Sequence, residues 1–105
     1  MMYDLVDLKQ AINYGRIEWR KHTLQRIAER QVLQKEVLQI LLSAEVIQAY
    51  PDDRPFPSLL VFGWIADRPI HVVVSYDKTG NLVYIITVYE PSIAVFEENF
   101  KTKRK

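Results

Sequence analysis

Residues 69–90, PIHVVVSYDKTGNLVYIITVYE, decide the fold of this chain. Two runs rich in β-branched and aromatic residues, 69–76 and 81–90, flank the segment DKTG, a strong turn signal. The run SLLVFGWIA at 58–66 has the same composition, and the turn signal DRP at 67–69 lies between it and the next run. We therefore predict a meander of three antiparallel strands, preceded by a shorter strand, EVIQAY, at 45–50.

Upstream of this region the hydrophobic period is that of helices. Apolar residues recur every three or four positions in 4–15, 21–30 and 33–43, and residues 16–20 between the first two segments are expected to be extended. The third helix is expected to face the core with Leu33, Val37, Ile40 and Leu41. The chain is therefore predicted to be an α+β protein, with N-terminal helices followed by an antiparallel meander of about four strands.

Length and composition bound the domain organisation. A chain of 105 residues with 49% hydrophobic residues suits a single domain with one core. We expect an N-terminal helix within 1–15, a central part at 17–90, and a short C-terminal helix with a basic tail within 91–105. The chain has no cysteine and no segment of the length of a membrane span, so we expect a cytoplasmic protein without membrane contact.

The segment HTLQRIAER, residues 22–30, carries two different stripes on one short helix. The cationic row, His22, Arg26 and Arg30, has the spacing i, i+4, i+8. The apolar stripe is formed by Leu24, Ile27 and Ala28. Such a row is either a solvated helix face or one wall of an anion site. The net charge of +1 does not by itself indicate nucleic-acid binding.

Strand register locates a possible partner for this row. If the turn uses residues 77–81, His71 lies opposite Thr87, and Tyr89 is its diagonal neighbour. The resulting polar face also holds Ser75, Val73, Val83 and Ile85. The opposite, apolar face holds Ile70, Val72, Val74, Ile86 and Val88. The alternative interpretation is that His71 is a satisfied, partly buried histidine and Thr87 a residue chosen for its strand propensity.

Other chemistries find less support in the sequence. The two histidines stand 49 positions apart without a spaced carboxylate, so we expect no metal site, and no cofactor motif is present. The two helices within 21–43 resemble a helix-turn-helix DNA reader only in part. The second helix offers only Lys35 and Glu36 near its start, which favours packing against the sheet over base recognition.

The sequence also resembles an uncharacterised bacterial family, a domain of unknown function, over residues 17–90. The row in HTLQRIAER and the segment IITVYEP at 85–91 carry the resemblance most specifically. That family is similar to toxins of the RelE, ParE and MqsR type, in which helices precede a curved antiparallel sheet. The resemblance implies a RelE-like fold, endoribonuclease activity and a cognate antitoxin partner.

The chemistry of metal-independent RNA cleavage offers an independent comparison with these residues. The 2′-hydroxyl needs a proton acceptor, the leaving oxygen an acid, and the phosphate cationic partners. We predict that His71, His22, Thr87 and Tyr89 are catalytic, and that the substrate, as free RNA or on the ribosome, is bound by Arg26 and Arg30. The alternative function is a non-catalytic module that docks an antitoxin or another protein partner. The composite site requires the cationic row to lie beside the sheet face with His71.

Overall fold

The computed structural model describes residues 5–43, 45–93 and 99–103. The helices are α1 (Leu5–Asn13), α2 (Lys21–Glu29) and α3 (Gln34–Ser43). The strands are β1 (Ile17–Trp19), β2 (Glu45–Tyr50), β3 (Ser58–Ile65), β4 (Arg68–Asp77) and β5 (Leu82–Tyr89). Within these residues no helix has the length and apolar content that a membrane crossing requires.

The architecture is α+β, as predicted, but the sheet has five strands and is mixed. Its strand order is β1-β5-β4-β3-β2, and β1 pairs with β5 in parallel while the other neighbours are antiparallel. The prediction of about four antiparallel strands missed β1 as a sheet member. A strand of three residues is too short to show alternation, and its pairing joins Ile17 to Val83, far along the chain.

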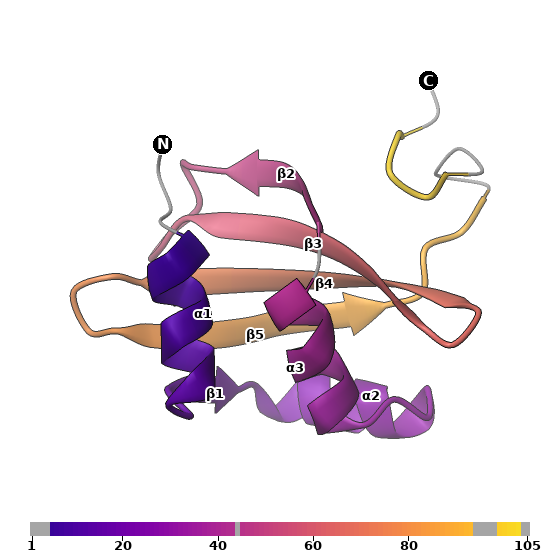
Figure 1. The fold of residues 1–105 in the computed structure, drawn as a ribbon, viewed down its shortest axis with the longest axis horizontal. Helices are drawn as coiled ribbons and strands as arrows, with labels where there is room; N and C mark the ends of the chain where they lie inside the picture. The colour runs from indigo at the N-terminus through magenta and orange to yellow at the C-terminus, as the bar shows by residue number, and fades with distance from the viewer. Residues whose placement is uncertain (1–4, 44, 94–98, 104–105) are drawn as a thin grey trace.

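The helices cover one face and one edge of the sheet. Figure 1 shows α1 and α3 in front of the sheet, while α2 runs along the edge formed by β1 and β5. The core lies between sheet and helices. Its most buried members are Ala11, Val37, Ile70, Val72, Val74, Val83, Ile85 and Val88. Gly63 lets α3 approach β3, because a Cβ there would stand 2.8 Å from Cγ2 of Ile40.

The packing of the helices corrects two details of the predicted core. In α2 the buried residues are Thr23 and Ile27, whereas Ala28 is exposed. The hydroxyl of Thr23 donates to the carbonyl oxygen of Ile86 at 2.7 Å, so a polar side chain joins Ile27 on the buried side of α2, while Leu24 is partly buried against the core. Leu33 is also exposed, because α3 begins one residue later and the Leu33 amide instead bonds the side chain of Glu36.

The predicted register of β4 and β5 was wrong by two separate shifts. The loop comprises only residues 78–81, and a bulge between Val73 and Val74 adds the second shift, so His71 lies opposite Tyr89 and not Thr87. Each shift of one residue moves side chains to the other face, and two shifts restore the face. Thr87 and Tyr89 therefore share the face of His71 as expected. Val83, which precedes the bulge, lies in the core instead.

Ile85, like Val83, was expected on the polar face of the sheet but is fully buried in the core. The short C-terminal helix expected within 91–105 falls mainly on residues 94–98, which lie outside the described part of the chain, as do residues 104–105 of the basic tail. Residues 99–103 are described and contact the sheet face opposite to the helices, at His71 and Phe62.

Candidate functional site

His71 and Tyr89 form a hydrogen-bonded pair on the sheet face that the helices leave open. The Nε2 atom of His71 lies 2.7 Å from the carbonyl oxygen of Phe100. A carbonyl only accepts, so we assign the imidazole proton to Nε2. Burial lowers the pKa of His71 below 6.5, partly offset by this backbone hydrogen bond, and favours the neutral ring. Its Nδ1 atom then accepts the hydroxyl proton of Tyr89 at 3.1 Å.

Tyr89 lies between two cavities at the end of β5. Burial, with a further contribution from Tyr50, raises the pKa of Tyr89 above 10.0, so its hydroxyl stays protonated at neutral pH. The smaller cavity, about 270 Å³, is lined by Arg30, Arg68, Tyr89 and Glu90 and by the core residues Val32, Ile70 and Val88. The larger one, about 590 Å³, includes Tyr50, Leu60, Lys101 and Lys103 in its lining. Tyr89 thus lines two cavities, each of which also includes cationic residues.

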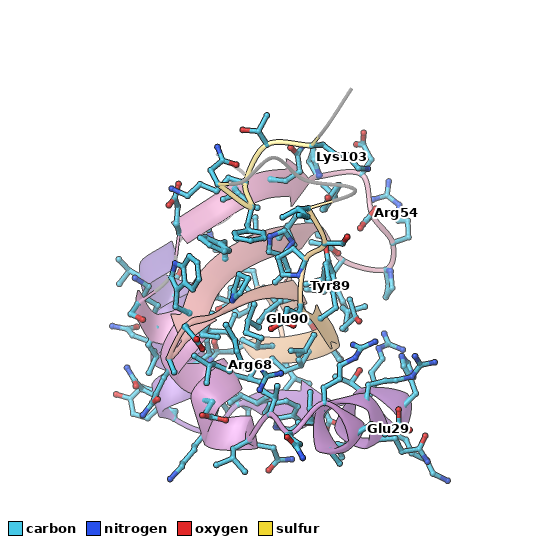
Figure 2. All side chains as sticks on the ribbon, turned by 90° about the vertical axis from the view of Figure 1, so that its right-hand side faces the viewer. Glu29, Arg54, Arg68, Tyr89, Glu90 and Lys103 are labelled. Atoms are coloured by element: carbon cyan, nitrogen blue, oxygen red, sulfur yellow. The ribbon has the colours of Figure 1, made fainter. Side chains whose placement is uncertain are left out.

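Arg68 connects three elements around the smaller cavity. Its guanidinium donates to the carbonyl oxygens of Arg30 at 2.8 Å and Gln31 at 3.3 Å, just after α2. Its Nε atom also pairs with the carboxylate of Glu90 at 3.3 Å. In Figure 2, Tyr89 and Glu90 lie above Arg68 at the end of β5. The guanidinium of Arg30 donates to the carbonyl oxygen of Val88, so two arginines with backbone partners line this cavity.

The cationic row, His22, Arg26 and Arg30, runs alongside β5. The hydroxyl of Thr23 donates to the carbonyl oxygen of Ile86, and the guanidinium of Arg30 donates to the carbonyl oxygen of Val88, so α2 and β5 run in the same direction. A helix advances about 6 Å in four residues, close to two residues of a strand. This spacing sets Arg26 level with Ile86 or the next residue, and His22 nearer the start of β5.

The charge of this row is not neutralised within the described part of the chain. There, neither His22, Arg26 nor Arg30 forms an ion pair with a carboxylate. His22 and Arg26 are exposed, and Arg30 is half-buried where it meets β5. Two arginines without matched carboxylates create a positive potential that favours an anionic partner.

The structure brings together part of the predicted composite site. Arg30 and Tyr89 line one cavity, and Tyr89 contacts His71. Thr87 lies on the same sheet face, opposite Val73. Arg26 and His22 continue the row along β5. His71 itself is fully buried, and its ring nitrogens contact the hydroxyl of Tyr89 and the carbonyl oxygen of Phe100.

Sequence reasoning missed several residues around Tyr89: Arg68, Glu90, Phe100, Lys101 and Lys103. Arg68 stood in a turn signal and the two lysines in a terminal basic run, and neither pattern indicates a contact with β5. The one available signal was the position of Arg68, which stands three residues before His71 in the segment DRPIH at 67–71.

Comparison with curated proteins returns no match. The sequence model of a family described as a domain of unknown function, DUF4258, matches residues 19–90. The matched part runs from the last residue of β1 to the residue after β5 and contains the cationic row, His71, Thr87 and Tyr89. Because this match covers more than half of the chain, the protein belongs to the DUF4258 family.

Proposed function

We propose that this protein is a toxin-like, metal-independent endoribonuclease with a RelE-like fold, controlled by a cognate antitoxin. The observation that carries the proposal is the unneutralised row of His22, Arg26 and Arg30 beside the hydroxyl-bearing end of β5. RNA provides a line of phosphates for such a row. The resemblance of the family to RelE-type toxins supports the same substrate.

Tyr89 and His71 supply a proton relay for the reaction. The hydroxyl oxygen of Tyr89 accepts the proton of the RNA 2′-hydroxyl while Tyr89 passes its own proton to Nδ1 of His71. The 2′-oxygen attacks the adjacent phosphorus and the bond to the 5′-oxygen breaks. Water protonates the leaving 5′-oxygen, and the hydroxide formed takes the proton back from His71 through Tyr89. The products are a 2′,3′-cyclic phosphate and a 5′-hydroxyl. His71 is thereby a base that acts through Tyr89.

The remaining residues act on the phosphate. Arg30 and Arg26 offset the charge that grows on the phosphoryl oxygens, and the hydroxyl of Thr87 donates a hydrogen bond on the same sheet face. His22 lies about 12 Å along the helix from Arg30, which is beyond the reach of one phosphate group. We assign His22 to a neighbouring phosphate of the same strand.

The test is cleavage of a single-stranded RNA oligonucleotide by the purified full-length chain, freed of any partner. We expect products with 2′,3′-cyclic phosphate ends, unchanged activity in EDTA, and no cleavage of the 2′-deoxy analogue. Tyr89→Phe should lower the rate roughly a hundred- to ten-thousand-fold, because it removes the proton acceptor. Tyr14→Phe, on the exposed end of α1, is the matched control.

Arg26→Gln should weaken RNA binding and reduce its salt dependence, whereas Lys35→Gln makes the same charge change at an exposed position of α3 and should not. Melting curves must show that each variant is folded. Absence of cleavage by the wild-type chain, on free RNA and on translating ribosomes, would overturn the proposal and favour the protein-docking module.

A further inference from the structure

Residues 99–103, here called the strap, lie on the open sheet face above His71. The carbonyl of Phe100 accepts the hydrogen bond from His71, and its ring meets Trp64 edge-on with centroids 6.1 Å apart. Lys101 lies 2.9 Å from the carboxylate of Glu45 on β2. The strap therefore covers a side chain that belongs to the proposed proton relay.

Beneath the strap is a continuous row of rings, which we call the aromatic platform: Phe62, Trp64, His71 and Tyr89. Neighbouring ring centroids are 5.5 Å apart for Trp64 and Phe62, 5.7 Å for Phe62 and His71, and 5.2 Å for His71 and Tyr89. The platform crosses β3, β4 and β5 and ends at Tyr89, beside Arg30. The neighbouring rings meet edge to face, at interplanar angles of 71°, 87° and 64°, and Trp64 at one end of the row is half exposed. An exposed aromatic ring stacks unpaired bases with little regard to sequence.

The strap divides the space above the platform. One cavity of about 590 Å³ reaches Tyr89, and another of about 580 Å³ reaches Phe62 and Trp64. Lys101 lines both cavities. Asn99 lines the cavity with Phe62 and Trp64, and Lys103 lines the one with Tyr89, so both cavities border the strap.

The groups that the strap presents resemble those of a nucleobase. Phe100 offers a planar ring to Trp64 and a carbonyl oxygen to Nε2 of His71. A nucleobase likewise combines a planar ring with hydrogen-bond acceptors. We propose that the aromatic platform binds unpaired bases of single-stranded RNA, and that the strap occupies this site in the RNA-free protein. The proposal rests on RNA being the substrate of the site described above.

The contacts of the strap favour its displacement by such a ligand. Phe100 has φ of +59°, a left-handed conformation that bulky side chains rarely adopt, so leaving it relieves strain. The pair of Lys101 and Glu45 is exposed on both sides, where water and salt weaken it. Once the strap moves, Lys101 becomes available to a phosphate.

Chemical modification of the two histidines measures the position of the strap without any RNA cleavage. Diethyl pyrocarbonate acylates accessible imidazole rings, and mass spectrometry locates the product. His22 is exposed and serves as the internal standard, whereas His71 is buried. We expect slow modification of His71 in the wild-type chain and faster modification in Phe100→Ala, which keeps the charge of the strap unchanged.

Binding is measured with a 2′-O-methyl oligonucleotide, which lacks the 2′-hydroxyl needed for cleavage. Phe100→Ala should bind it several-fold more tightly than wild type, because the competing ring is gone. Trp64→Ala in the Phe100→Ala background should weaken binding roughly tenfold, the scale of one lost base stack. Tyr14→Ala, an exposed aromatic residue at the end of α1, is the matched control and should change nothing.

The outcomes separate this proposal from the proposed function. If Phe100→Ala exposes His71 but leaves oligonucleotide affinity unchanged or lower, the platform is not a base-binding site. Unchanged modification of His71 in Phe100→Ala would equally overturn the role of the strap. If the platform variants behave as expected but natural RNA is never cut, the endoribonuclease proposal fails while the binding site stands. If natural RNA is cleaved but oligonucleotide affinity is unchanged by the substitutions at Trp64 and Phe100, the endoribonuclease proposal stands and the base-binding site is refuted.

Discussion

At the scale of single residues, His71 has the most demanding environment. It is fully buried between the rings of Phe62 and Tyr89, and its two ring nitrogens contact one hydroxyl and one carbonyl. The hydrogen bond to Phe100 suits either charge state of the ring, but the bond from Tyr89 requires Nδ1 to be unprotonated. Protonation of His71 would therefore place a charge in a buried site and reverse this hydrogen bond, so that Nδ1 donates to the hydroxyl of Tyr89.

The stability of the fold should consequently depend on pH through His71. Because burial lowers its folded pKa below 6.5, the unfolded chain takes up a proton that the folded protein does not. The free energy of unfolding should be fully maintained above about pH 6.5, fall as the pH is lowered through that value, and level off below the folded pKa.

Urea unfolding between about pH 7.5 and 5.5 measures this effect, since few carboxyl groups titrate there. His71→Gln should be less stable at all pH values but should lose this part of the slope. His22→Gln changes an exposed side chain and should keep it. An identical slope in wild type and His71→Gln would assign the pH dependence to other groups.

At the scale of elements, Arg68 joins the end of α2 to the ends of β4 and β5. Carbonyl groups at a helix C-terminus lack partners within the helix, and Arg68 satisfies those of Arg30 and Gln31. The same guanidinium pairs with Glu90 after β5. Arg68 thus holds Arg30 of the cationic row next to Tyr89.

We expect Arg68→Gln to destabilise the protein by about 1–2 kcal/mol, because the amide replaces only part of these hydrogen bonds. Hydrogen exchange should accelerate at the amides of Arg30 and Val32, which close the end of α2. Lys78→Gln, in the exposed β4–β5 loop, makes the same charge change and is the control. Equal protection of these amides in both variants would show that Arg68 is not needed to hold α2.

At the scale of the whole molecule, one core joins both edges of the sheet. The buried cluster contains residues of all three helices and of β3, β4 and β5, with Trp19 of β1 packed against it. No set of these elements has a separate core among the described residues. The sheet and the helices should therefore unfold together.

Two tryptophans at different places test this cooperativity. Trp19 reports on β1 in the Trp64→Phe variant, and Trp64 reports on β3 in the Trp19→Phe variant. In each variant we expect the urea transition followed by fluorescence to coincide with that followed by circular dichroism. An earlier loss of the Trp19 signal would show that the parallel pairing of β1 and β5 melts separately.

The positions of α2, α3 and the four long strands could be predicted because their signals are local. The periodicity of apolar residues and the turn residues of DKTG each involve positions close together in the chain. Such patterns can therefore be recognised in a single sequence. The same local pattern indicated the cationic row on α2. It also placed His71, Thr87 and Tyr89 on one face, although only because the two register shifts cancelled.

The sequence by itself therefore determined the α+β class, the order of the main elements and the residue types available to a site. The tertiary structure decided that β1 joins β5, that a bulge follows Val73, and that Phe100 covers His71. It also decided that Arg68 reaches Arg30, 38 residues away. These features depend on contacts between segments distant along the chain, and hydrophobic periodicity carries no information about which distant backbone groups will meet.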